Sequence, residues 1–318
     1  MSSPVFTARF YSRFCSRFYS TLPEPVQNKY GGKSLEASVR HCVDLVRERD
    51  LEFFQWATMA LPTKQERAPV LVLKALQIEI ESIQRAARTE TLLQMRYQWW
   101  RDSINKAFNA KKSYEMAQPV MKAFSELVQS YDTISNARIL EMLDAYEMDA
   151  MRGETFLHSL DDLEQHARAT AGNFVALQME ACGVRHDVVE EIAPSLGVGI
   201  GVTSALRRAL GMLSEYGISY LPEDVCQRHK VDPSNFFDGS DTRNELKEIA
   251  REIAEMAQGH LDVANSAGNR DGQAKAFALQ GLSSELYLGS LRKKGYDLVT
   301  TRGATPMGYL LRLKWHTL

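Results

Sequence analysis

The chain has 318 residues, of which 44% are hydrophobic and 25% are charged, and its formal net charge is −2. These values are typical of a globular protein with a sizeable core, and the near-neutral charge argues against a nucleic-acid partner. The four cysteines, Cys15, Cys42, Cys182 and Cys226, lie far apart without C-x-x-C spacing. This pattern excludes a disulfide framework or a zinc site and indicates ordinary reduced thiols.

The first residues differ from the rest of the chain. Arg9, Arg13 and Arg17 recur at a spacing of four, as do phenylalanines from Phe6 to Phe18, and the first acidic residue is Glu24. On a helix this spacing places a basic stripe beside an aromatic stripe. An amphipathic, Arg-rich, Ser-rich and acid-free segment is typical of a mitochondrial transit peptide, predicted here over residues 1–22. The alternative is an irregular basic tail.

The remaining chain, 34–318, is predicted to be one all-α domain. Apolar residues recur at i, i+3, i+4 and i+7, and no alternating run predicts a sheet. Without a linker rich in Gly, Pro or Ser, the helices are expected to surround one core or central cavity. In chain order the predicted helices span about Ser34–Ala60, Gln65–Arg88, Glu90–Asn109, Glu115–Tyr131, Asn136–Met151, Leu160–Cys182, Asp187–Ser214 with a break near Pro194, Arg243–Ala267 and Ala274–Leu291, followed by a C-terminal helix.

Common catalytic motifs are missing from this sequence. Gly197, Gly199 and Gly201 form G-x-G-x-G, but Val202 holds the last position of a dinucleotide fingerprint and no strand precedes it. Small residues that permit close helix packing are the better interpretation. The acids from Glu141 to Asp149 share one side of a helix, which favours a solvated face over a metal site.

Several stretches, taken in order, resemble the squalene/phytoene synthase family over roughly residues 38–291. They are "VLKALQIEIESIQRA" (72–86), "LDAYEMDAM" (143–151), the segment 159–184, and "LGVGIGVTSALRRALGMLSEYGISYLPEDV" (196–225). The resemblance implies a large helical domain of the isoprenoid-synthase type with a central cavity. Active members ionise a prenyl diphosphate, and two D-x-x-x-D motifs face each other across the cavity and hold Mg²⁺.

Both motifs are degenerate in this chain. The first aligns with Glu81–Arg85 and the second with Arg208–Met212, where neither acid remains. An Asp-to-Arg reversal repels a divalent ion as well as deleting its ligand. The resemblance therefore implies a pseudoenzyme without metal or cofactor. The candidate positions of the relic cavity are Glu81, Arg85, Asp149, Arg207, Arg208 and Tyr220.

A narrower resemblance is to the branch of this family that assists assembly of mitochondrial complex I. "CVDLVRERDLEFF" (42–54), "LLQMRYQWWRDSI" (92–104) and "GISYLPEDV" (217–225) resemble segments of that branch. It implies a non-catalytic factor on the matrix side of the inner membrane, acting at an early membrane-subunit stage. Implied partners are complex I subunits or other assembly factors, with peripheral contact to the membrane.

Two alternatives and one surface stay open at this point. The relic cavity could bind an anionic lipid or isoprenoid phosphate through Arg85, Arg207 and Arg208 without metal, or these arginines could pair with acids such as Glu81. A residual prenyl-diphosphate transferase is the remaining alternative. In the C-terminal segment, Leu310, Leu311, Leu313 and Trp315 could enter a membrane interface beside Arg312 and Lys314, or pack on the body.

Overall fold

The computed structural model describes residues 32–86, 89–110, 116–152, 157–216, 219–232, 243–268 and 272–317. The predicted transit peptide (1–22) and Cys15 lie outside these ranges. Every regular element within them is a helix, which confirms the all-α prediction. The elements are α2 (Gly32–Arg49), α3 (Leu51–Ala60), α4 (Lys64–Ala86), α5 (Glu90–Asn109), α6 (Pro119–Ser130), α7 (Asn136–Met151), α8 (Leu160–Ala167), η1 (Arg168–Gly172), α9 (Asn173–Ala181), α10 (His186–Tyr216), α11 (Glu223–Arg228), α12 (Arg243–Gly268), α13 (Gly272–Ala278), η3 (Leu279–Gly281), α14 (Leu282–Lys293) and α15 (Pro306–Thr317).

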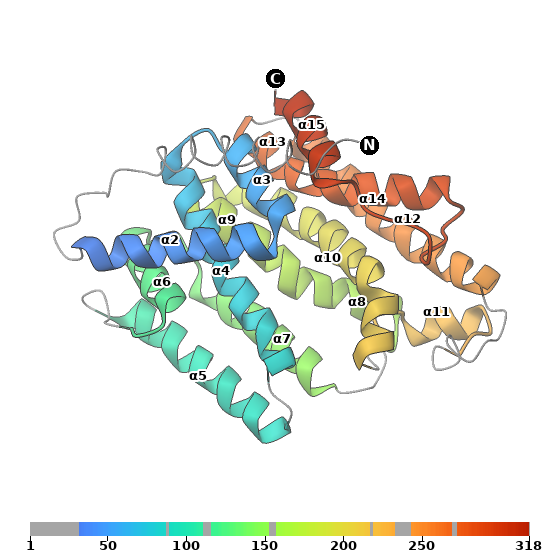
Figure 1. Cartoon of the computed structure of the whole chain (residues 1–318), viewed down its shortest axis with the longest axis horizontal. Coiled ribbons are helices and arrows are strands. Elements are labelled where there is room, and N and C mark those ends of the chain that lie inside the picture. The colour runs from blue at the N-terminus through green and yellow to red at the C-terminus, as the bar shows by residue number, and fades with distance from the viewer. Residues whose placement is uncertain are drawn as a thin grey trace, which may run out of the picture.

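The long helix α10 organises the molecule. It packs against α12 on one side and against η1 and α9 on another, while α2 packs on α4 and α6 (Figure 1). The helix α5 runs along the lower edge of the view beside α6 and α7, and α15 packs on α3 at the upper edge. The helices therefore surround α9 and the middle of α10 from several directions.

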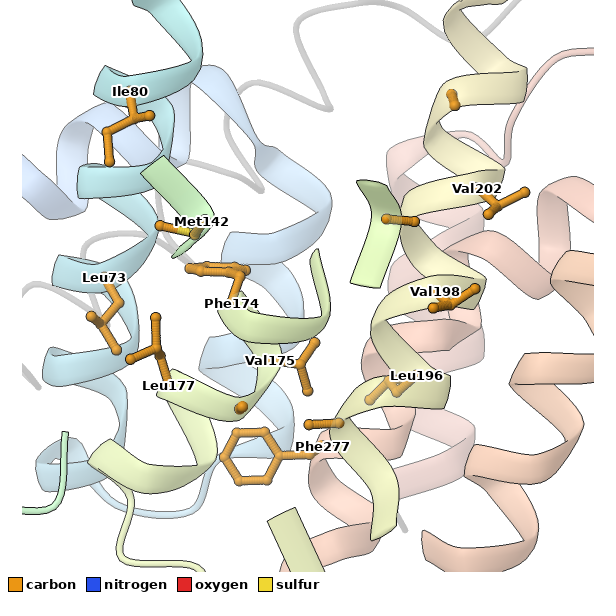
Figure 2. Packing of buried hydrophobic residues seen from close by; sticks show 14 of the residues in the cluster. Leu73, Ile80, Met142, Phe174, Val175, Leu177, Leu196, Val198, Val202 and Phe277 are labelled. Carbon is orange, nitrogen blue, oxygen red and sulfur yellow. The ribbon is translucent and has the colours of Figure 1, made fainter. Parts of the chain in front are cut away.

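The buried core joins α4, α9 and α10. Figure 2 shows Leu73 of α4 facing Leu177 of α9, with Leu196 and Val198 of α10 on the other side of α9. These side chains are all nearly or fully buried. Because α9 presents apolar residues toward both neighbours, it is buried along most of its length, as a helix that is hydrophobic all round must be.

The glycines of the G-x-G-x-G stretch allow helices to approach closely. A Cβ on Gly197 would lie 2.2 Å from the Cα of Gly172, and one on Gly201 would lie 2.8 Å from the Cβ of Ala167. Both distances are far below ordinary carbon contacts, so the backbones can approach this closely only with glycine. The packing interpretation of these glycines is thereby confirmed.

The helix boundaries near Asp50 and Pro194 differ from the sequence prediction. The segment 34–60, predicted as one helix, is divided at Asp50, whose carboxylate accepts a hydrogen bond of 3.0 Å from the amide of Phe53 and caps α3. Conversely, Pro194 does not break α10 and lies inside a continuous helix. A proline in mid-helix is tolerated here because α10 is held by packing on both sides.

The segment predicted as a helix over 160–182 contains a change of helix type. Ser159 and Asp162 form a capping box at the start of α8. The five residues of η1 then form a π-helical turn, in which the amide of Asn173 donates to the carbonyl of Arg168. A short helix, α11, also follows the Tyr-Leu-Pro turn, in the interval between two predicted helices where none was predicted.

Candidate functional site

A cavity of about 730 Å³ lies among α3, α4, α7, η1, α9, α10 and α15. All six candidate positions, Glu81, Arg85, Asp149, Arg207, Arg208 and Tyr220, line it. They come from α4, α7, α10 and the turn before α11, so residues far apart in sequence meet around one space. Their approach follows from the packing of α9 between α4 and α10 and of η1 against α7 and α10.

Glu81 and Arg85 lie one helical turn apart on α4 but have different surroundings. The Glu81 carboxylate accepts a hydrogen bond of 2.7 Å from the hydroxyl of Tyr146, which in turn accepts one of 2.9 Å from Gln77. Burial, followed by the nearby Glu81 charge, raises the pKa of Tyr146 well above its ordinary value. The Tyr146 phenol is therefore a neutral donor to Glu81. Arg85 is exposed at the cavity, and within the described part of the chain it has no hydrogen bond or ion pair.

Asp149 is buried and fully engaged by its neighbours. One carboxylate oxygen accepts a 2.7 Å hydrogen bond from Arg152, and the other accepts a 2.8 Å bond from the hydroxyl of Tyr220. The Asp149 and Arg152 side chains are only 7% and 13% exposed. Burial, with the Asp149 charge, raises the pKa of Tyr220. The arrangement is a closed structural ion pair, with little capacity left for a metal.

The adjacent arginines of α10 point to different partners. Arg207 forms an ion pair of 3.2 Å with Glu52, and its guanidinium lies 5.4 Å from the ring centre of Tyr287. Arg208 donates a bond of 3.3 Å to the carbonyl of Ser204, and its guanidinium lies 5.8 Å from the ring centre of Tyr220. No carboxylate within the described residues pairs with Arg208. Its charge is thus available to the cavity.

Sequence reasoning did not identify two further cations on the cavity wall. Lys74 lies 2.9 Å from Asp50 and 5.0 Å from the ring centre of Phe53. Burial raises the pKa of Asp50, but Lys74 and the Phe53 amide outweigh burial, so that pKa lies below its ordinary value. A lone lysine within the apolar run "VLVLKALQI" was the signal that could have located it. Arg49, at the end of α2, lines the cavity with no ion pair to any described residue.

One imidazole also borders the cavity. Burial lowers the pKa of His166, and the charges of Arg152 and Arg208 act in the same direction, whereas Asp149 opposes them. The His166 ring lies 6.5 Å from the Tyr146 ring, edge to face. The ring is therefore held neutral beside the basic wall.

The donor set of this cavity does not fit a magnesium cluster. Its acids are Asp50, Glu52, Glu81 and Asp149. Three of these carboxylates are paired with Lys74, Arg207 and Arg152, and Glu81 accepts from a phenol. Mg²⁺ requires free hard oxygen ligands in near-octahedral geometry, which paired carboxylates beside cations do not offer. Within the described ranges, no group of three or more His, Cys, Asp or Glu side chains is arranged to hold a metal ion.

The other acids singled out in the sequence lie away from this site. Asp224 of α11, which follows the Tyr-Leu-Pro turn, pairs with Arg228 at 3.0 Å and does not line the cavity. On α7, Asp144 and Glu147 both bind Arg101 of α5. Their carboxylates serve the contact between α5 and α7, so the predicted solvated face is partly an interhelical ion-pair cluster.

Similar proteins fall into two groups. The protein named "NADH dehydrogenase (ubiquinone) complex I, assembly factor 6" in Bos taurus is 26% identical over 284 residues, covering 87% of this chain and 82% of that protein. Its Drosophila melanogaster homolog is 25% identical over 301 residues, covering 93% and 86%. Among the described residues, no helix contains an apolar stretch of the length needed to span a bilayer.

Two solved structures with a similar fold are named synthases. A dehydrosqualene synthase in complex with ligand superposes with a TM-score of 0.73 at 17% identity, covering 89% of this chain and 97% of that one. A squalene synthase from Alicyclobacillus acidocaldarius gives 0.70 at 15% identity, covering 83% and 96%. These likenesses confirm the isoprenoid-synthase type of fold. A sequence model described as squalene/phytoene synthase matches residues 47–315. The chain therefore belongs to the squalene/phytoene synthase family.

Proposed function

We propose that this protein is a non-catalytic assembly factor for mitochondrial complex I. The observation that carries the proposal is the similarity, over most of the chain, to proteins named complex I assembly factor 6 in mammals and insects. The protein would act at an early membrane-subunit stage, on the matrix side of the inner membrane. Its partners would be complex I subunits or other assembly factors.

The paired carboxylates support the non-catalytic part of the proposal. A synthase needs free acids for Mg²⁺, whereas Asp149 is held by Arg152 and Tyr220, and Arg208 occupies an aligned acid position. The purified protein, incubated with Mg²⁺ and farnesyl or geranylgeranyl diphosphate, is expected to release no diphosphate. Turnover that disappears in Asp149→Asn would overturn this part and restore a transferase.

Loss of the protein is expected to lower the amount of assembled complex I. Cells lacking it should show less complex I on native gels, with other respiratory complexes unchanged, and re-expression should restore the level. Pulse-labelling of the mitochondrially encoded membrane subunits should show the block before the first membrane intermediate. Normal complex I in these cells would refute the assembly proposal, and a block only at a late intermediate would refute the early stage.

Mitochondrial import is proposed to depend on residues 1–22. The stripe of Arg9, Arg13 and Arg17 supports this, since import sequences are amphipathic and basic. The triple change Arg9→Gln/Arg13→Gln/Arg17→Gln should leave the protein outside mitochondria. Unchanged import of this variant would show that the segment is not the targeting signal.

A second candidate function is metal-independent binding of an anionic lipid or isoprenoid phosphate. Arg49, Arg85 and Arg208 line the cavity, and none has a carboxylate partner among the described residues. Guanidinium groups bind phosphate oxygens directly. Mass spectrometry of an organic extract of the purified protein should detect a bound phospholipid or an isoprenoid phosphate and would distinguish the two sources.

Charge reversal tests this second candidate directly. Arg208→Glu should remove the extracted ligand, whereas Arg251→Glu should retain it. Arg251 is a suitable control because it is half exposed on α12 and pairs with Glu248 outside the cavity. An extract with no phosphate-bearing molecule, or equal retention in both variants, would refute cavity binding without affecting the assembly proposal.

A further inference from the structure

The helix α15 presents apolar residues on two opposite faces. Tyr309 and Leu313 are 1% and 0% exposed, and they fix the helix to the body, where it packs on α3. Leu311 and Trp315 are 62% and 79% exposed. Each residue advances about 100° around a helix, so Leu311 and Trp315 lie together on the side opposite the buried pair. The outward stripe continues back to Met307, which is half-buried.

Basic residues border this outward stripe on both sides. Arg312 follows one edge and Lys314 the other, and both are exposed. The sequence has no acidic residue between Val299 and Leu318, while Arg302, Arg312 and Lys314 are basic. A tryptophan and a leucine between long basic side chains are typical of helices that lie in a membrane interface, where the charged ends reach the headgroups.

A second exposed apolar stripe, on α5, has a different charge pattern. Leu92, Met95 and Trp99 are 39%, 65% and 46% exposed. Charges of both signs border them, because Arg96 and Asp102 are exposed on either side of this stripe. The α15 stripe is therefore the one whose charge is complementary to an anionic surface.

We propose that the outward face of α15, formed by Met307, Leu311 and Trp315 between Arg312 and Lys314, docks on an anionic phospholipid bilayer. This inference rests on the proposed action at a membrane and names the surface that makes the contact. The helix is already ordered by its buried face, so docking carries little cost of folding. Pro306 and Tyr309 of the same helix line the cavity, so the docked helix would be one wall of that space.

Vesicle co-sedimentation of the full-length protein tests this proposal. The background should carry Arg9→Gln/Arg13→Gln/Arg17→Gln, since that basic segment would itself attract anionic lipid. Vesicles of phosphatidylcholine with phosphatidylglycerol are expected to bind the protein, and phosphatidylcholine alone much less. Leu311→Ser/Trp315→Ser should lower the partition coefficient by about tenfold or more, because both side chains lose their apolar burial in lipid. Arg312→Gln/Lys314→Gln should remove the preference for anionic vesicles.

A matched control uses the same residue types on α5. Leu92→Ser/Trp99→Ser should bind vesicles like the parent protein, and thermal unfolding should show that all variants are folded. The tryptophan emission of the parent should shift to shorter wavelength with anionic vesicles, and Trp315→Phe should abolish that shift. Absence of vesicle binding by the parent would indicate a protein partner for this face and overturn the proposal. Equal loss of binding in the α5 and α15 variants would also overturn it.

The outcome can be separated from that of the assembly proposal. If complex I is normal in cells lacking the protein while vesicle binding depends on Leu311 and Trp315, only the assembly function fails. If complex I is depleted but Leu311→Ser/Trp315→Ser binds vesicles normally, only the docking surface fails. The two measurements share no readout, so neither result can conceal the other.

Discussion

Replacing Gly197 with alanine tests the close contact between α10 and η1. The added Cβ would lie 2.2 Å from Cα and 2.3 Å from the backbone nitrogen of Gly172. Ordinary carbon contacts are about 3.5–4.0 Å, so the two backbones would have to separate by more than about 1 Å. No rotamer change can relieve the clash, because the obstacle is backbone rather than the end of a side chain.

Two opposing effects determine the free energy of unfolding of this variant. Alanine favours a helix over glycine by about 1 kcal/mol. Overpacking costs about 1–3 kcal/mol and occasionally more, and a backbone clash within a fully buried layer belongs at the upper end. The neighbouring Leu196 and Val198 are fully buried and would lose contacts as the helices separate. We expect a net loss of about 2 kcal/mol or more.

Denaturant unfolding followed by circular dichroism measures this effect, and Gly211→Ala is the matched control. Gly211 lies in the same helix, and a Cβ there would meet nothing within 4 Å. That variant should be unchanged or more stable by up to about 1 kcal/mol, from helix propensity alone. Equal or greater stability of Gly197→Ala would refute the packing account of the glycine stretch.

Three further predictions concern the cavity wall. Asp149→Ala should lower the free energy of unfolding by about 3–5 kcal/mol in urea titrations, because the buried guanidinium of Arg152 loses its carboxylate. Asp149→Ala/Arg152→Met should recover much of that loss, and a loss below about 1 kcal/mol for Asp149→Ala would contradict the structural role of the pair. Burial lowers the pKa of His166, so the unfolded chain binds a proton at a higher pH than the folded protein, and the free energy of unfolding should fall as the pH drops below about 6.5. In His166→Gln the free energy of unfolding should depend less steeply on pH, and an unchanged slope would argue against this origin. Arg85→Gln and Arg208→Gln should each change the free energy of unfolding by less than about 0.5 kcal/mol, because neither guanidinium has a carboxylate partner among the described residues. A larger loss of stability, measured by chemical denaturation, would reveal an ion pair.

Helical periodicity predicted much of the fold because the sequence pattern is strong where helices pack on one side. The predicted bounds of α5 and α7 match those observed, and both helices have one buried and one exposed face. Asp50 was missed as a boundary because apolar residues continue in register on both sides of it. Its effect depends on one side chain capping the amide of Phe53, which periodicity does not report.

The sequence indicated which residues of α4 and α10 line the cavity, but it indicated less about the lining residues of the other helices. The family resemblance pointed to Glu81, Arg85 and Arg208, and these residues line the space. Whether these side chains pair with acids is decided by the folded structure, since Asp149 is held by Arg152, the residue that caps the end of α7. Arg49 enters the site only because α2 ends there, and a basic residue at a helix end is otherwise ordinary in a sequence.

The π turn of η1 holds one residue more than an unbroken α-helix would hold between α8 and α9. The hydrogen bond from the amide of Asn173 to the carbonyl of Arg168 links residues five apart, so the turn behaves as a one-residue insertion. Because a π turn contains more residues per turn than an α-helix, the extra residue is absorbed locally and α9 keeps its orientation relative to α8. Deleting Ala171 should therefore leave Phe174, whose ring centre lies 5.8 Å from that of Phe53, facing the cavity. A single-residue gap at this position in an alignment would mark a relative that lacks the π turn but keeps the orientation of α9.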